Sequence, residues 1–109
     1  MSTTTTAAAA TAAQVREMLE EMNQLAVLYQ LARAEVSLLE QEHADVSAQL
    51  QQAEPADDMV LHRALLVRDQ DIGRERDTWY ARIMELDSAI VMLHGAVTQL
   101  DPHLLPPLH

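Results

Sequence analysis

The sequence predicts an all-α protein, an antiparallel two-helix coiled-coil hairpin that assembles into a four-helix bundle. Three observations predict this fold class. Apolar residues recur at alternating steps of three and four over residues 15–53, with no intervening Gly or Pro, and a similar series covers residues 79–100. A Pro-containing stretch separates the two series. A mean spacing of about 3.5 residues keeps an apolar stripe on one face of a left-handed coiled coil, whereas a strand needs a spacing of about two.

Composition and charge narrow the classes of partner. The chain has 17 acidic residues against seven Arg, no Lys and a net charge of −10. This charge disfavours binding to nucleic-acid phosphates and to anionic membrane surfaces. The chain contains no Cys, which is compatible with a reducing compartment, and no apolar run approaches the roughly 18 residues of a membrane span. We therefore expect an intracellular, cytoplasmic location and a protein partner, with no nucleic acid and no membrane.

Residues 1–12 form a leader rich in Ser, Thr and Ala that lacks the features of a secretory signal. Thr11 and Gln14 fit a capping box, in which the two side chains satisfy free amides at a helix start. We therefore expect the first helix to begin at about residue 13 and to continue to about residue 53.

One apolar stripe, here called the seam, accounts for the periodicity of the first helix, and His43 is its one polar member. The seam residues are Val15, Met18, Met22, Leu25, Tyr29, Ala32, Val36, Leu39, His43, Val46, Leu50 and Ala53. Leu25, Tyr29, Val36 and Leu39 are predicted to make central contacts with the second helix.

Residues 54–57, which include Pro55, are predicted to form the turn, because Pro is not tolerated in a helix interior. The second helix is expected over residues 58–101, with a kink near Gly73, and residues 102–109 form a Pro/Leu tail. Its clean seam consists of Trp79, Ile83, Leu86, Ile90, Leu93, Val97 and Leu100. Extending the same spacing backwards gives Arg76, Ile72, Asp69, Leu65 and His62, so this part of the seam is half polar. Antiparallel folding about residue 55 or 56 then places Arg68 near His43 and the arginines of the second helix opposite acids of the first.

Further apolar residues lie off the seam, and a wider apolar arc is typical of a helix packed on two sides. We predict that they form an oligomer or partner interface, either in a homodimer or in a heteromeric coiled coil. These residues are Val27, Leu28, Leu31, Leu38, Tyr80, Met84, Val91 and Met92. Residues 59–67 are also apolar on most sides, which makes the hairpin tip a candidate docking point for a partner. The tail, with Leu104, Leu105 and Leu108, is a second candidate.

The one pattern that suggests chemistry is Glu40-Gln41-Glu42-His43. A Glu-x-x-His step resembles the ligand pairs of carboxylate-bridged dimetal sites in four-helix bundles, and Asp69 could lie at the same level. The alternative is that His43 is a polar insertion that sets the register of the seam. The sequence favours the second interpretation, so we expect no cofactor and name Glu40, His43 and Asp69 only as metal-ligand candidates.

No serine has a base at a suitable spacing, and two glycines cannot supply a phosphate-binding loop, so the sequence predicts no catalytic residue and no enzyme. We predict a coiled-coil adaptor, scaffold or structural subunit that acts by helical self-association or by docking on partner helices. Two alternatives stay open at this point. One is an acidic helical chaperone or antagonist that covers a basic or helical client surface, and the other is a ferritin-like dimetal protein.

Overall fold

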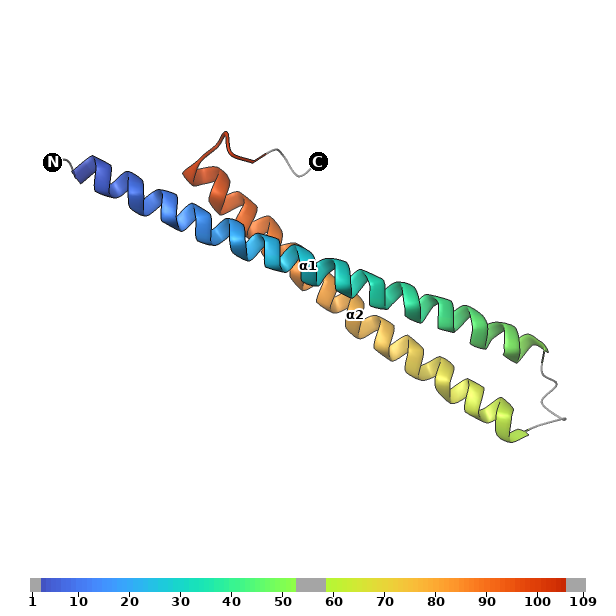
Figure 1. Ribbon diagram of the computed structural model, residues 1–109. Helices are drawn as coiled ribbons and strands as arrows, with labels where there is room; N and C mark the ends of the chain where they lie inside the picture. Colours follow the sequence, from blue (N-terminus) through green and yellow to red (C-terminus); the bar gives the residue numbers. More distant parts are fainter. Residues whose placement is uncertain (1–2, 53–58, 106–109) are drawn as a thin grey trace. The chain divides into compact units, whose positions relative to one another are not determined.

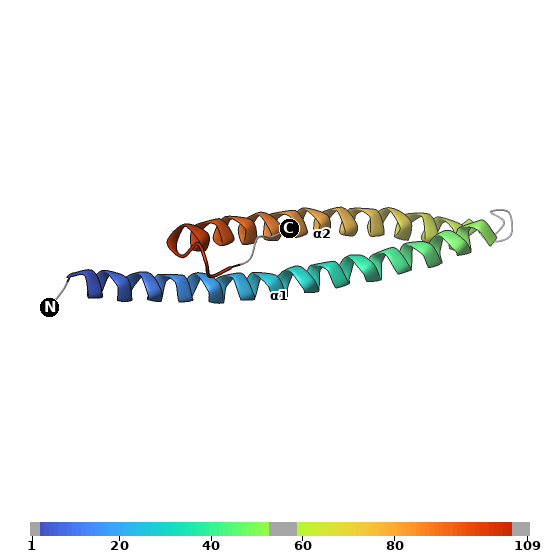
Figure 2. The same ribbon diagram turned by 90° about the horizontal axis from the view of Figure 1, so that it is seen from above.

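The computed structural model describes residues 3–52 and 59–105, with side chains from residue 9 onward. Two helices account for most of them: α1 (Thr3–Gln52, 50 residues) and α2 (Met59–Leu100, 42 residues). The described residues contain no strand. The prediction of an all-α protein with two antiparallel helices is confirmed (Figures 1 and 2). Assembly into a four-helix bundle stays a prediction.

The start of α1 differs from the prediction, because the helix begins at Thr3 and not at about residue 13. The part of the predicted leader from residue 3 onward is therefore helical, and Thr11 lies inside the helix and does not cap it. The physical reason is the alanine content of residues 7–13, since Ala has the highest intrinsic helix propensity and nothing there breaks the helix. The helix propensity of these alanines therefore outweighs the capping signal at Thr11.

The helix α2 continues through Gly73, where the sequence predicted a kink, and Gly73 has no positive φ. After Leu100 the chain turns: the Asp101 N–H donates to the Val97 carbonyl at 2.8 Å, and the Leu104 N–H donates to the Asp101 carbonyl at 3.2 Å. The predicted turn at residues 54–57 and the end of the predicted tail lie outside the described residues.

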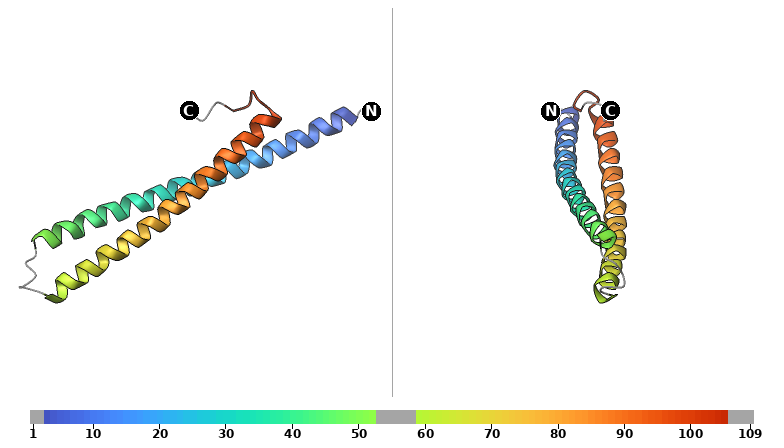
Figure 3. Two further views of the ribbon diagram at one scale, coloured as in Figure 1. Left: turned by 180° about the vertical axis from the view of Figure 1, so that it is seen from behind. Right: turned by 90° about the vertical axis from the view of Figure 1, so that its right-hand side faces the viewer.

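The chain divides into two compact units. Unit 1 combines Met1–Gln30 with Met84–His109, and unit 2 is the continuous stretch Leu31–Ile83. Each unit therefore contains a segment of α1 and a segment of α2 that run in opposite directions, as Figure 3 also shows. The units are described separately below.

The core of unit 2 is a single row of apolar side chains contributed by both helices. Leu39 and Val46 of α1 pack with Leu65 and Ile72 of α2, and Ile72 is fully buried. The partly buried side chains of Leu50 and Trp79 extend this cluster. All six belong to the 3–4 spaced series, because a helix pair buries only the stripe that faces its partner.

Unit 1 has a thinner core of the same kind. Val15 of α1 and Leu86 and Val97 of α2 are buried, with Val97 fully so. The end of the unit carries an open hollow of about 530 Å³, lined by Thr11, Ala12, Val15, Arg16, Leu19, Leu100, Asp101 and Leu104. In the described part of the chain, neither helix combines the length and apolar character that crossing a membrane requires.

Candidate partner interface

The eight side chains predicted to form an oligomer or partner interface are all exposed to solvent, with exposed fractions from 42% to 76%. Unit 1 contains Val27, Leu28, Met84, Val91 and Met92, and unit 2 contains Leu31, Leu38 and Tyr80. None of the eight therefore takes part in the cores of the two units, and their role in association stays a prediction.

The eight side chains predicted for the central seam have the opposite placement. Val36, Leu39 and Leu86 are buried, and the remaining five are half-buried: Leu25, Tyr29, Trp79, Ile83 and Ile90. The two sets thus separate by exposure into side chains packed between α1 and α2 and side chains that point away from that contact. The exposed set is the part of the surface that is available for a further helix.

The N-terminal segment of α2, residues 59–67, adds exposed apolar surface that the predicted interface set did not contain. Met59, Val60, Leu61, Leu66 and Val67 are exposed, Val60 by 81%. The sequence signal was present, since this segment is apolar on most sides of a helix. Because the segment also contains His62 and Arg63, it is apolar on most sides but not all, and its exposed apolar side chains are surface that a partner could cover.

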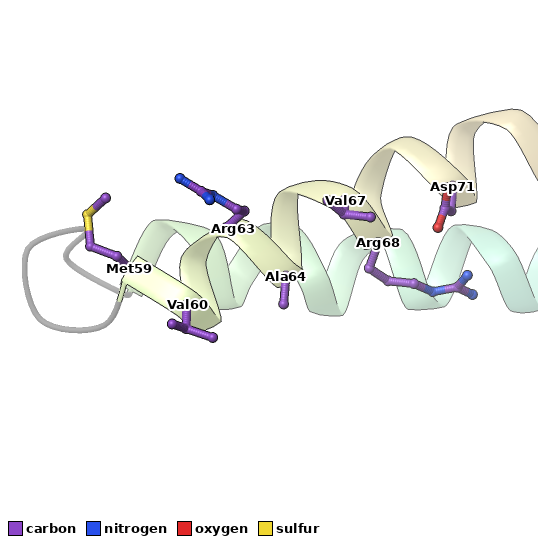
Figure 4. Close-up of a pocket in the computed structure, with 7 residues that line it drawn as sticks. All are labelled: Met59, Val60, Arg63, Ala64, Val67, Arg68 and Asp71. Atoms are coloured by element: carbon purple, nitrogen blue, oxygen red, sulfur yellow. The ribbon is translucent and has the colours of Figure 1, made fainter.

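A shallow hollow of about 560 Å³ follows this segment along the outside of α2. Its lining combines apolar and charged side chains of one helix, shown in Figure 4: Met59, Val60, Arg63, Ala64, Val67, Arg68 and Asp71. Ala64 is small and leaves room between its longer neighbours. Such a lining fits an apolar ridge from another helix, with charged side chains at the rim.

The metal-ligand candidates do not converge on one point. His43 Nδ1 lies 2.8 Å from Asp69 Oδ1, so a polar residue of one seam meets a polar residue of the other. The Glu40 carboxylate instead accepts a hydrogen bond of 2.6 Å from the Tyr80 hydroxyl. Over the described ranges, no group of three or more His, Cys, Asp or Glu side chains is arranged to hold a metal ion. That His43 sets the register of the seam stays a prediction.

One side of the seam in unit 2 carries an ion-pair network. Both guanidinium nitrogens of Arg68 that face Glu42 lie 2.5 Å from its two carboxylate oxygens, and a third nitrogen lies 3.1 Å from Glu75. The bidentate hydrogen bond from Arg68 lowers the pKa of Glu42. The same hydrogen bond, with the one to Glu75, raises the pKa of Arg68. The sequence placed Arg68 near His43, and the ion pair forms with the adjacent residue.

The other side of the seam in unit 2 is marked by the Tyr80–Glu40 hydrogen bond. Because the phenol donates to a carboxylate there, the pKa of Tyr80 is raised. A small hollow of about 210 Å³ adjoins it, lined by Arg33, Val36, Ser37, Glu40, Tyr80 and Ile83. This lining is largely polar or charged, in contrast to the hollow on residues 59–71.

These surfaces can provide apolar contact area and oriented charges to another helix, and such features are suited to binding. Among the described residues, the polar side chains discussed above form ion pairs and hydrogen bonds with each other, either between α1 and α2 or within α2. Comparison of the chain with protein-family models, with curated proteins and with solved structures finds no match in any of the three.

Proposed function

We propose that this protein is a non-catalytic coiled-coil subunit that acts by helical association, and that two copies form a four-helix bundle. The observation that carries this proposal is the exposure of all eight apolar side chains predicted to lie off the seam. Scattered exposed apolar residues are ordinary on soluble proteins, but a regular apolar stripe on a helix already packed on its other side is typical of bundle interfaces.

The energetics favour covering these side chains. Full burial of a Leu, Val or Met side chain contributes roughly 1.5–3 kcal/mol relative to leaving it exposed. Leu31 and Leu38 are each 59% exposed, so a second helix could recover a substantial part of that free energy at either position. A symmetric dimer buries two copies of each such residue, and the free energy gained by this burial offsets the entropic cost of association.

The experiment compares the parent protein with the double variant Leu28→Glu, Leu31→Glu by light scattering coupled to size exclusion. The parent is expected at twice the 12.2 kDa of one chain, and the variant at the mass of one chain. The matched control is Asn23→Glu, Gln30→Glu, which adds the same charge at exposed polar positions of α1. Circular dichroism checks that helicity is retained. A parent that stays at the mass of one chain over the accessible concentration range contradicts the proposal.

The net charge of −10 supports a second candidate, an acidic helical protein that covers a basic or helical surface of a client. Charge-driven capture weakens as salt screens the interaction over about 8–10 Å. Binding of a basic amphipathic peptide that falls steeply between low and physiological salt favours this candidate. Binding that is indifferent to salt, or absent, contradicts it.

A further inference from the structure

The α2 segment of unit 1 carries a second row of 3–4 spaced residues, here called the outer row, on the side of the helix opposite the buried Leu86. The row consists of Met84, Ser88, Val91 and Gly95. All four are exposed, Met84 by 71% and Val91 by 48%. At about 100° per residue they lie within an arc of about 60°. This segment therefore has one apolar stripe packed on α1 and another that faces solvent.

The outer row has the composition of a contact surface. It is uncharged, although the chain has a net charge of −10, and the acidic residues Glu85 and Asp87 lie on its two sides. Met92, 76% exposed, lies next to it. A Cβ added at Gly95 meets no described atom within 4 Å, so packing inside the chain gives no reason for a Gly, which is unfavourable in a helix interior.

Large and small residues alternate along the outer row, so the row is complementary to a second copy of itself. Two copies that lie antiparallel, with the midpoint between residues 89 and 90 on a two-fold axis, bring Met84 opposite Gly95 and Val91 opposite Ser88. Each large side chain then faces a small one, and symmetry makes each pairing twice. A parallel arrangement would place Met84 against Met84 and Gly95 against Gly95, which alternates crowded and empty layers.

We propose that a second copy of this chain covers the outer row, with the two α2 segments packed antiparallel about an axis near residues 89 and 90. Met92 lies close to that axis at the edge of the contact, where it comes near Met92 of the partner subunit. This inference goes beyond the proposed function, because the contact is on a different helix from Leu28 and Leu31. One chain can therefore contact two neighbours through two separate surfaces.

The contact through the outer row is short. It covers about 16 Å of helix, at about 1.5 Å per residue, which is small for a stable interface. We therefore expect it to form at higher protein concentration than the dimer of the proposed function. Because Glu85 and Asp87 border the row on both copies, added salt is expected to strengthen this association by screening their repulsion.

Gly95→Leu tests the contact with little effect on the single chain, since the added Cβ has free space and Leu is a better helix former than Gly. In the associated form the new side chain occupies the space of Met84 of the partner subunit. The dissociation constant of this contact is expected to rise at least about tenfold, while the melting temperature does not fall. The matched control is Gly73→Leu in unit 2, where a Cβ also meets no described atom within 4 Å, and it leaves the dissociation constant unchanged.

Sedimentation equilibrium at increasing protein concentration separates the two contacts. The parent is expected to exceed the mass of two chains at the highest concentrations, and Gly95→Leu is expected to stop at two. The double variant Leu28→Glu, Leu31→Glu is expected to dimerise weakly through the outer row alone.

The outcomes distinguish this inference from the proposed function. If Gly95→Leu associates as the parent does, the outer row is not a contact, while the proposed function stands. If Gly95→Leu reduces the parent to the mass of one chain and Leu28→Glu, Leu31→Glu does not, the outer row is supported and the contact through α1 is wrong. If the parent stays at the mass of one chain at every concentration, both fail.

Disulfide trapping tests the antiparallel register, since the chain has no Cys of its own. A mixture of the single variants Met84→Cys and Gly95→Cys is expected to form a covalent 1:1 product under mild oxidation, because a disulfide needs Cα atoms about 4.4–6.8 Å apart. Each variant alone is expected to form little product, since identical positions of the two copies lie about 16 Å apart along the axis.

The control mixture replaces Gly95→Cys by Ala96→Cys, which lies on a different side of α2. Equal yields from the two mixtures overturn the proposed register. So does a yield from Met84→Cys alone that matches the yield of its mixture with Gly95→Cys, because that result indicates a parallel contact.

Discussion

Truncation of Ile72 to Ala tests whether unit 2 is held by the single row of packed side chains between its helices. Ile72 is fully buried and packs in the cluster with Leu39, Val46 and Leu65. The change deletes three carbon atoms, which at about 0.8 kcal/mol per buried methylene removes somewhat more than 2 kcal/mol of transfer free energy. A residual cavity adds to this loss, so we expect a decrease of about 3 kcal/mol in the free energy of unfolding, within the usual range of about 2–5.

The assay is urea unfolding followed by helical circular dichroism at one fixed protein concentration, because association couples to stability. Ile72→Val, which deletes one methylene, is expected to cost only about 0.5–1.5 kcal/mol and keeps the test readable if Ile72→Ala does not fold. The matched control is Leu66→Ala on the same helix, where 44% of the side chain is exposed, and a smaller loss is expected. If Ile72→Ala costs less than about 1 kcal/mol, or no more than Leu66→Ala, then the row of seam side chains does not determine the stability of the unit.

Three further predictions concern unit 2. Because the hydrogen bond from Arg68 lowers the folded-state pKa of Glu42, this carboxylate stabilises the fold above its unfolded-state pKa near 4.5 and loses that effect as pH falls through the lower folded value. Glu42→Gln should therefore reduce the loss of stability between neutral and acid pH in unfolding curves, and an unchanged acid limb would count against the ion pair. The hydrogen bond to Glu40 raises the folded-state pKa of Tyr80, so this hydrogen bond stabilises the fold below the unfolded-state pKa near 10.0 and stops doing so as pH rises through the higher folded value. Tyr80→Phe should therefore remove the later of the two tyrosine steps from an alkaline absorbance titration. If both tyrosines of the parent protein titrate near the ordinary value, the prediction is wrong. Gly73→Ala should raise stability by up to about 1 kcal/mol, because the helix is regular there and an added methyl meets nothing within 4 Å; a lower melting temperature would show that Gly73 is required.

The sequence alone determined the fold class and the placement of the seam. Steps of three and four are a local property of the chain, and they select one face of each helix whatever lies opposite. Ile72, which lies in the half-polar stretch of the second series, is buried because its position in the repeat requires it, despite the charged residues on either side. The same reasoning separated Leu31 and Leu38 from the seam, and the structure leaves both exposed.

The start of the first helix and the continuity of the second could not be predicted from local signals. The start of α1 at Thr3 and the continuity of α2 at Gly73 depend on propensity summed over many residues. A cap signal such as Thr11 or a single Gly is worth only about 1 kcal/mol and is overridden when the flanking residues favour the helix.

Only the tertiary structure decided which polar groups meet. The sequence placed Arg68 and His43 at one level along the hairpin. It did not determine the partners, which are Glu42 for Arg68, Asp69 for His43 and Tyr80 for Glu40. Periodicity gives the face on which a side chain lies. A hydrogen bond also depends on the relative rotation and axial offset of two helices to within an ångström or so, and those are set by how the apolar side chains between them pack.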